Sequence, residues 1–228
     1  MGKTGAMGVD RDVVARQDEE TVQAAYDVVA DTYADHFRST EPEAPLDLAM
    51  VEHFVALLPQ GAAVLDAGGG AGRMLPVLAG LGCQVEGVDL SPAMVGRARA
   101  DHPEFVTTQG SLTDLPHGDE TFDGVFSWYS TIHSPDAELP RIAAELRRVA
   151  GPNGLVLVAF QSGSWVRDVA PAYAAHGLDV VLERYNRTPD QVVDVLAGAG
   201  MTEVARMERK PLSDKERDAQ AVVIARVS

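Results

Sequence analysis

The stretch Val64-Leu65-Asp66-Ala67-Gly68-Gly69-Gly70-Ala71-Gly72-Arg73 indicates the fold more directly than any other part of this chain. An apolar run ends at Asp66, a loop of small residues follows, and a second apolar run, Val85-Glu86-Gly87-Val88-Asp89, ends in another acid. A strand that turns abruptly into a helix needs positive φ or close backbone approach, and glycine permits both. The second acid follows the first glycine by about twenty residues, where a carboxylate can accept hydrogen bonds from ribose hydroxyls. The stretch therefore predicts a nucleoside-binding βαβ unit.

The spacing of the glycines separates two classes of nucleoside-binding fold. A dinucleotide-binding loop has the pattern G-x-G-x-x-G, and counted from Gly68 its third glycine falls on Arg73, whose side chain would obstruct a pyrophosphate. This chain instead has the pattern D-x-G-x-G-x-G over Asp66, Gly68, Gly70 and Gly72. With both acids in place, it resembles the Rossmann-like (class I) S-adenosylmethionine-dependent methyltransferases of small molecules. The resemblance implies S-adenosylmethionine as the cofactor, with Asp66 suited to its ammonium and Asp89 to its ribose.

Two further segments are similar to that family and imply how the adenine is bound. Leu90-Ser91-Pro92-Ala93-Met94 resembles a helix start that places Met94 beside the adenine, and proline is favourable at a first helical position. The segment 109–116 resembles the adenine-contacting stretch, with Ser111 and Leu112 beside the base. Many relatives carry an acid where this chain has Ser111, and a hydroxyl is a weaker acceptor, so Asp114 is an alternative contact. The implied cofactor site comprises Asp66, Ala67, Gly68, Gly70, Gly72, Arg73, Asp89, Leu90, Met94, Ser111, Leu112, Ser127 and Tyr33.

Apolar patterns along the rest of the chain predict alternating strands and helices. Strands are expected over 63–66, 84–89, 105–109 and 124–127, with helices over 72–81 and 92–100. The segment 147–154 resembles the family's turn before the fifth strand, which the resemblance places over 155–160. Strands separated by helices form a parallel sheet. After a helix over 189–199, strands over 201–210 and 220–227 follow each other without a helix and must be antiparallel neighbours. We predict an α/β fold, a doubly wound, mostly parallel seven-stranded sheet with a C-terminal antiparallel hairpin and helices on both faces.

The predicted organisation is a flexible segment over 1–20 followed by a single methyltransferase domain over 21–228. Within it, 21–60 forms two N-terminal cap helices, over 21–37 and 46–58, and in relatives a helix similar to the first lies over the cofactor mouth. The segment 161–187 carries aromatic residues and leaves the carboxyl edge of the sheet, where ligands of open α/β sheets bind. We interpret it as a substrate-side insertion, although its aromatic residues could equally pack beneath a loop.

His133 is the predicted catalytic base. It follows the fourth strand, and imidazole is the side chain best suited to take a proton near neutral pH. The alternative is a hydrogen-bonded structural role for His133. Tyr129 is a second catalytic candidate. The substrate candidates are Trp128, Tyr129, Trp165 and Tyr173.

Composition and charge limit the classes of methyl acceptor and partner that this chain can bind. The 228 residues carry a net charge of −15, which repels phosphate backbones, and Arg206, Arg209 and Lys210 read as a solvated strand edge. One cysteine excludes an internal disulfide framework, and no apolar run is long enough to span a bilayer. We expect a cytoplasmic enzyme without metal, nucleic-acid or membrane partners, and leave a homodimer open.

We therefore expect methyl transfer to an O, N or C atom of a small molecule, and a specialised metabolite because an Asn-Pro-Pro-Tyr loop is missing. Two alternatives remain. One is a cofactor-binding protein of the same fold with a non-methylating role. The other is an NAD(P)-dependent oxidoreductase, which Arg73, the C-terminal hairpin and the lack of a Tyr-x-x-x-Lys pair disfavour.

Overall fold

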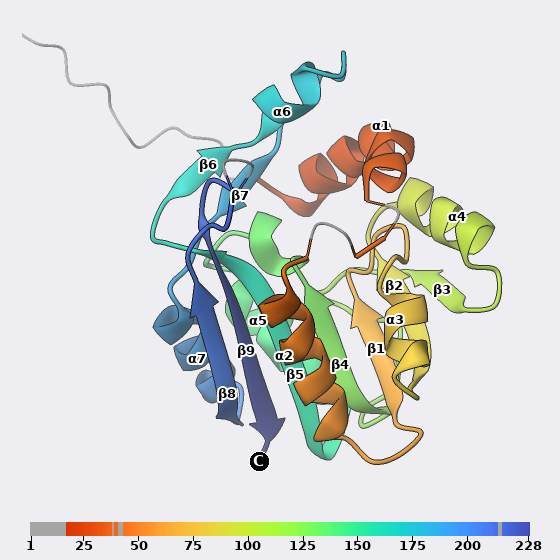
Figure 1. Ribbon diagram of the computed structural model, residues 1–228, viewed down its shortest axis with the longest axis vertical. Coiled ribbons are helices and arrows are strands. Elements are labelled where there is room, and N and C mark those ends of the chain that lie inside the picture. Colours follow the sequence, from red (N-terminus) through yellow and green to blue (C-terminus); the bar gives the residue numbers. More distant parts are fainter. Residues whose placement is uncertain (1–16, 38, 41–42, 214–215) are drawn as a thin grey trace, which may run out of the picture.

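A seven-stranded sheet forms the centre of the protein, in a computed structural model that describes residues 17–37, 39–40, 43–213 and 216–228. Its strand order is β3-β2-β1-β4-β5-β9-β8 (Figure 1). Strands β1 to β5 pair in parallel, whereas β9 pairs antiparallel with both β5 and β8. The predicted fold is confirmed. The strands are β1 (Ala63–Ala67), β2 (Gln84–Asp89), β3 (Val106–Gln109), β4 (Phe122–Trp128), β5 (Ala150–Ser162), β8 (Met201–Arg209) and β9 (Ala219–Val227).

Helices cover both faces of this sheet (Figure 1). Apolar side chains of α5 and α7 pack on one face, and those of α2 and α3 pack on the other. Because β5 and β9 are covered on both sides, they carry nearly unbroken apolar runs rather than alternating ones. None of the described helices is both long and apolar enough to cross a membrane. The helices are α1 (Glu19–His36), α2 (Pro45–Ala56), α3 (Leu75–Gly80), α4 (Pro92–Asp101), α5 (Leu139–Val149), α6 (Ala170–Ala174) and α7 (Pro189–Gly198).

The turn predicted over 147–154 is wrong. Helix α5 continues to Val149, and β5 begins at Ala150 with an irregular first section in which Asn153 has a φ of 61°. The physical reason is the apolar stripe of α5, whose buried positions recur at helical spacing up to the last residue of the helix. These buried positions are Leu139, Ile142, Ala143, Leu146 and Val149.

The segment 161–187 forms a small arm beside α1, above the main sheet (Figure 1). Its strands β6 (Val166–Asp168) and β7 (Glu183–Tyr185) pair antiparallel in a separate two-stranded sheet, with α6 between them. Most of the segment predicted to be flexible lies outside the described residues. Its described end is fixed, because Gln17 is buried and its side chain binds the backbone of His133 and of Glu183.

Arg209 is not part of a solvated strand edge. Its guanidinium is buried and binds both carboxylate oxygens of Asp47, at 2.7 and 2.5 Å, and also binds Glu216. The planar guanidinium can donate two parallel N–H bonds to a carboxylate, which gives a geometrically specific ion pair. Arg209 therefore fastens α2 to the C-terminal hairpin.

Candidate functional site

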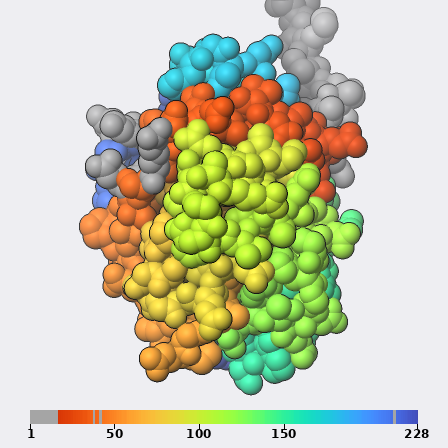
Figure 2. All heavy atoms as spheres, turned by 90° about the vertical axis from the view of Figure 1, so that its right-hand side faces the viewer, coloured from red at the N-terminus to blue at the C-terminus, as the bar shows by residue number. Residues whose placement is uncertain are grey.

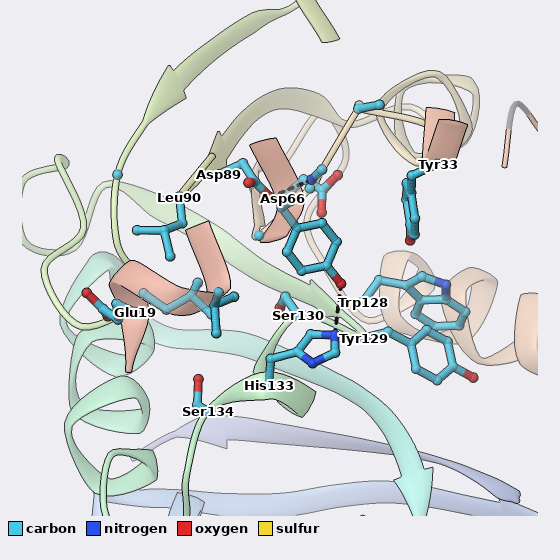
Figure 3. Close-up of a pocket in the computed structure, with 18 of the residues that line it drawn as sticks. Glu19, Tyr33, Asp66, Asp89, Leu90, Trp128, Tyr129, Ser130, His133 and Ser134 are labelled. Atoms are coloured by element: carbon cyan, nitrogen blue, oxygen red, sulfur yellow. Dashed lines mark hydrogen bonds between the residues drawn. The ribbon is translucent and has the colours of Figure 1, made fainter. Parts of the chain in front are cut away.

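A pocket lies at the carboxyl ends of β1, β2 and β4, beneath α1 (Figure 3). Helix α1 rests on α4, and the space-filling view shows the two in direct contact (Figure 2). Asp27 fixes this contact because its carboxylate accepts from the Ser91 hydroxyl at 2.5 Å and from the Ala93 amide at 3.2 Å. The pocket is therefore roofed by the N-terminal helix. Figure 3 places Glu19 and Leu90 at one end of the pocket and Tyr33 and Trp128 at the other.

The glycine loop between β1 and α3 forms the floor. The amides of Gly68 and Gly69 donate to the carbonyl of Val88 at 2.8 and 3.0 Å, which draws the loop against β2. Gly68 has a φ of 78°, and a Cβ atom there would lie 2.2 Å from Cβ of Ser130. Only glycine fits both the conformation and the space at this position.

Asp66, at the end of β1, is the most unusual group in the pocket. Its side chain is 1% exposed, and neither carboxylate oxygen has a hydrogen-bond partner among the described residues. Burial raises the pKa of Asp66 to about 7, Arg73 opposes this shift, and Asp89 adds to it. An unpaired buried carboxylate is costly to the fold, so it indicates a site for a cationic donor.

Arg73 supplies the positive charge at the same end. Its Nη1 lies 2.6 Å from Oε1 of Glu43, and its guanidinium lies over the ring of Phe37, 5.7 Å from the centroid. The same Glu43 oxygen accepts from the Trp128 indole at 2.8 Å. This end of the pocket thus holds Asp66 and Glu43 around one guanidinium.

Asp89 ends β2 and is fixed by the backbone. One carboxylate oxygen accepts from the Gly70 amide at 2.8 Å and the other from the Ser91 amide at 2.9 Å. Burial raises the pKa of Asp89, and these two bonds oppose that shift. Each oxygen keeps a lone pair for a ligand hydroxyl.

His133 is buried, at 6% exposure, and both ring nitrogens have partners. Nδ1 lies 2.7 Å from the Glu183 carbonyl, which can only accept, so Nδ1 carries the proton. Nε2 therefore accepts from the Tyr26 hydroxyl at 2.8 Å, the dashed line at His133 in Figure 3. Burial lowers the pKa of His133 to about 4. The ring is therefore neutral at pH 7, and although His133 lines the pocket, its Nε2 is occupied by the Tyr26 hydroxyl.

Tyr129 lines the pocket, but Figure 3 shows its hydroxyl directed away from His133. Its φ of 57° is unusual for a residue other than glycine, and such strain concentrates at functional sites. Trp165 is 48% exposed, and Tyr173 lies on α6; neither lines the pocket.

The pocket brings together eleven of the residues predicted from the sequence. These are Tyr33, Asp66, Gly68, Gly70, Arg73, Asp89, Leu90, Leu112, Trp128, Tyr129 and His133. The other predicted residues are not among those that line the pocket. These are Ala67, Gly72, Met94, Ser111, Ser127, Trp165 and Tyr173.

Sequence reasoning missed several lining residues, notably Glu19, Tyr26 and Ser130. Tyr26 could have been found from its position in the apolar stripe of the first helix, which faces the rest of the protein. Glu19 carried no comparable signal because it contacts Ser111, which is far away in the sequence. Asp114, the alternative adenine contact, is exposed and lies outside the lining.

Comparison with known proteins matches the part of the chain that carries much of this pocket. A sequence profile described as "Methyltransferase domain" matches residues 64–154, which span the glycine loop, Asp89 and His133. Residues 64–154 thus match a methyltransferase domain.

Two curated relatives match this chain over part of their length. An uncharacterized methyltransferase of Synechocystis sp. is 36% identical over 42% of this chain and 45% of its own. A malonyl-[acyl-carrier protein] O-methyltransferase of Erwinia pyrifoliae is 29% identical over 79% of this chain and 66% of its own. The match thus spans about half to two thirds of these two relatives.

The solved structure of magnesium protoporphyrin IX methyltransferase from Synechocystis PCC 6803, with bound S-adenosylhomocysteine, has the same fold. It superimposes with a TM-score of 0.67 at 19% identity, over 92% of this chain and all of that one.

Proposed function

We propose that this protein binds S-adenosylmethionine in the pocket beneath α1 and transfers its methyl group to an O, N or C atom of a small molecule. The observation that carries the proposal is the Asp66 carboxylate, which is buried in the pocket and has no hydrogen-bond partner in the described part of the chain. Its burial is unfavourable until a cationic donor binds it. The ammonium of the cofactor's amino-acid end is such a donor.

The residues around Asp66 fit the rest of this cofactor. Arg73 would hold the carboxylate of the amino-acid end, since its guanidinium faces the pocket beside Glu43. Asp89 would accept from the ribose hydroxyls with lone pairs that its two amide donors leave free. Leu90 and Leu112 line the opposite end and offer apolar faces to a base.

When bound, the cofactor supplies a methyl group already activated on a sulfonium, so the protein's task is largely alignment and exclusion of water. Helix α1, which roofs the pocket, would exclude water from it. Where the acceptor must lose a proton, the Tyr26 oxygen would take it while the Tyr26 proton passes to Nε2 of His133. A pKa of about 4 makes His133 a weak base, so we expect this relay to contribute modestly.

A small, uncharged or cationic acceptor fits the net charge of −15, and a specialised metabolite is our preferred class. The cytoplasmic location, the homodimer and the lack of a nucleic-acid partner stay predictions from the sequence.

The test is calorimetric titration with S-adenosylmethionine, S-adenosylhomocysteine and NADH, followed by a labelled-methyl screen of small hydroxyl, amine and enol acceptors. We expect micromolar binding of the first two ligands and none of NADH. Binding of NADH alone would favour the oxidoreductase. Tight S-adenosylmethionine binding without transfer to any acceptor would favour the non-methylating alternative.

A further inference from the structure

Glu19, in the first turn of α1, reaches across to the loop that follows β3. Its Oε1 accepts from the Ser111 hydroxyl at 2.5 Å and from the Thr113 hydroxyl at 3.0 Å. The loop is itself braced, because the Thr113 amide donates to the Ser111 hydroxyl oxygen at 2.9 Å. Two segments more than ninety residues apart in the sequence therefore meet at one carboxylate.

This carboxylate lines the pocket at the end where Figure 3 labels Leu90. Gly110 and Leu112, the two chain neighbours of Ser111, also line the pocket. Gly110 is tightly packed, since a Cβ atom there would lie 2.5 Å from Cδ of Pro116. This part of the pocket thus combines the apolar side chains of Leu90 and Leu112 with closely packed backbone at Gly110, beside Glu19. Such a lining suits a planar ring, and a ring that carries an N–H donor would meet the carboxylate.

The hydrogen bonds of Glu19 leave it able to accept such a donor. Both hydroxyls bind Oε1, and none of the hydrogen bonds among the described residues uses Oε2. Two further carboxylates, of Asp18 and Glu138, also line the pocket, and the charges of Glu19 and Asp18 both act on Glu138. Asp18 is engaged at the start of α1, where it accepts from the Thr21 amide and hydroxyl. Like charges this close make a ligand N–H donor more favourable at Glu19.

We propose that Glu19 accepts a hydrogen bond from the exocyclic amino group of the cofactor's adenine, while Ser111 and Thr113 orient Glu19. Ser111 then acts as a positioning residue and not as the adenine contact. The inference rests on the proposed function, since it deepens the assignment of the same pocket. It also makes α1 part of the cofactor site, so that the roofing helix recognises the base.

The experiment compares two ligands, S-adenosylhomocysteine and its analogue with hydrogen in place of the exocyclic amino group. Their dissociation constants are measured by calorimetry for the wild type, Glu19→Ala, Glu19→Gln and the control Glu20→Ala. Glu20 is the matched control because it lies on the same helical turn, is exposed and lies outside the lining.

We expect the wild type and Glu20→Ala to prefer S-adenosylhomocysteine by about tenfold or more, the effect of a hydrogen bond to a charged group. Glu19→Ala should bind the two ligands within about twofold of each other, and Glu19→Gln should retain about threefold because an amide oxygen is a weaker acceptor. The measure is the ratio of the two constants, so a general weakening caused by a loosened α1 does not affect it.

The inference is overturned if Glu19→Ala weakens both ligands equally and keeps the wild-type ratio, since Glu19 would then be a structural link only. A wild type without any preference overturns it too. In both cases tight binding of S-adenosylhomocysteine leaves the proposed function intact. If the wild type binds neither ligand, the proposed function fails and the inference fails with it.

Discussion

The hydroxyl of Tyr26 donates to Nε2 of His133 over 2.8 Å, although the two residues are 107 positions apart in the sequence. The other ring nitrogen of His133 is held by the carbonyl of Glu183. This chain of bonds joins α1, the short 3₁₀ turn η1 (Thr131–His133) after β4, and strand β7. The roof over the pocket is thereby fixed to the residue that the sequence predicts as the base.

Removing either end of this bond should slow methyl transfer more than it weakens cofactor binding. We expect Tyr26→Phe and His133→Gln each to lower kcat about tenfold, with the dissociation constant of S-adenosylhomocysteine nearly unchanged. In His133→Gln the amide oxygen can still accept from Tyr26 but cannot take a proton. The measurements are steady-state kinetics with a responsive acceptor and calorimetry.

His133→Ala provides the contrast, because it removes both the acceptor and the base. If His133→Gln keeps full turnover while His133→Ala loses it, His133 positions Tyr26 and is not a base. If affinity falls as far as turnover in all of these variants, the contact serves only the structure of the roof.

Cofactor affinity should depend on pH through Asp66. A ligand ammonium prefers the ionised carboxylate, and a pKa of about 7 leaves half of the free protein protonated at pH 7. The affinity for S-adenosylhomocysteine should therefore fall about tenfold per pH unit below 7 and level off above it. Calorimetry between pH 5.5 and 8.5, a range set around that pKa of about 7, tests this. Methylthioadenosine, which lacks the amino-acid end, is the control and should show no such dependence.

Asp66→Asn should bind S-adenosylhomocysteine weakly and without the pH dependence. The same variant should be more stable than the wild type at pH 8. Burial raises the pKa of the folded carboxyl, so its stabilising contribution is present at low pH and is lost as the pH rises through about 7. A gain of roughly 1–3 kcal/mol in the free energy of unfolding is expected at pH 8. A loss of stability at pH 8 would contradict the view that the buried, ionised Asp66 carboxylate destabilises the ligand-free fold.

Asp89→Ala should weaken cofactor binding by about 1–3 kcal/mol, the loss expected for hydrogen bonds to a charged group. Part of the loss reflects the amides of Gly70 and Ser91, which this change leaves without their acceptor. Asp89→Asn keeps one acceptor oxygen and should lose less. Asp114→Ala, at an exposed carboxylate outside the pocket, is the control and should leave affinity unchanged. Unchanged binding in Asp89→Ala would remove the ribose assignment.

Gly68→Ala should destabilise the fold by about 2–3 kcal/mol and impair cofactor binding, because it combines positive φ with a steric conflict. The new Cβ atom would lie 2.2 Å from Cβ of Ser130. Adding Ser130→Gly should recover part of this stability by relieving the conflict but not the backbone strain. Gly96→Ala in α4 is the control, since nothing lies within 4 Å of its Cβ position, and should stabilise by about 0.5–1 kcal/mol. Denaturant unfolding measures all three variants.

The sequence by itself determined the features that depend on local pattern. Apolar runs, the glycine spacing and the acids Asp66 and Asp89 predict the parallel sheet, the terminal hairpin and the position of the cofactor, because strand period, backbone conformation and strand ends are local properties. The prediction of a turn over 147–154 was wrong because it followed a local resemblance, whereas the apolar stripe of α5 continues the helix to Val149.

Only the tertiary structure decided which distant side chains meet. Nothing in the local pattern of Glu19 or Tyr26 shows that they reach Ser111 and His133, because those contacts arise from the way α1 crosses the carboxyl edge of the sheet. Several elements together bury Asp66, which has no hydrogen-bond partner among the residues that the structure describes, and bury His133, which is therefore neutral at pH 7. The local sequence pattern predicts where the strands end. Tertiary packing determines the protonation state and the hydrogen-bond partners of the side chains at those ends.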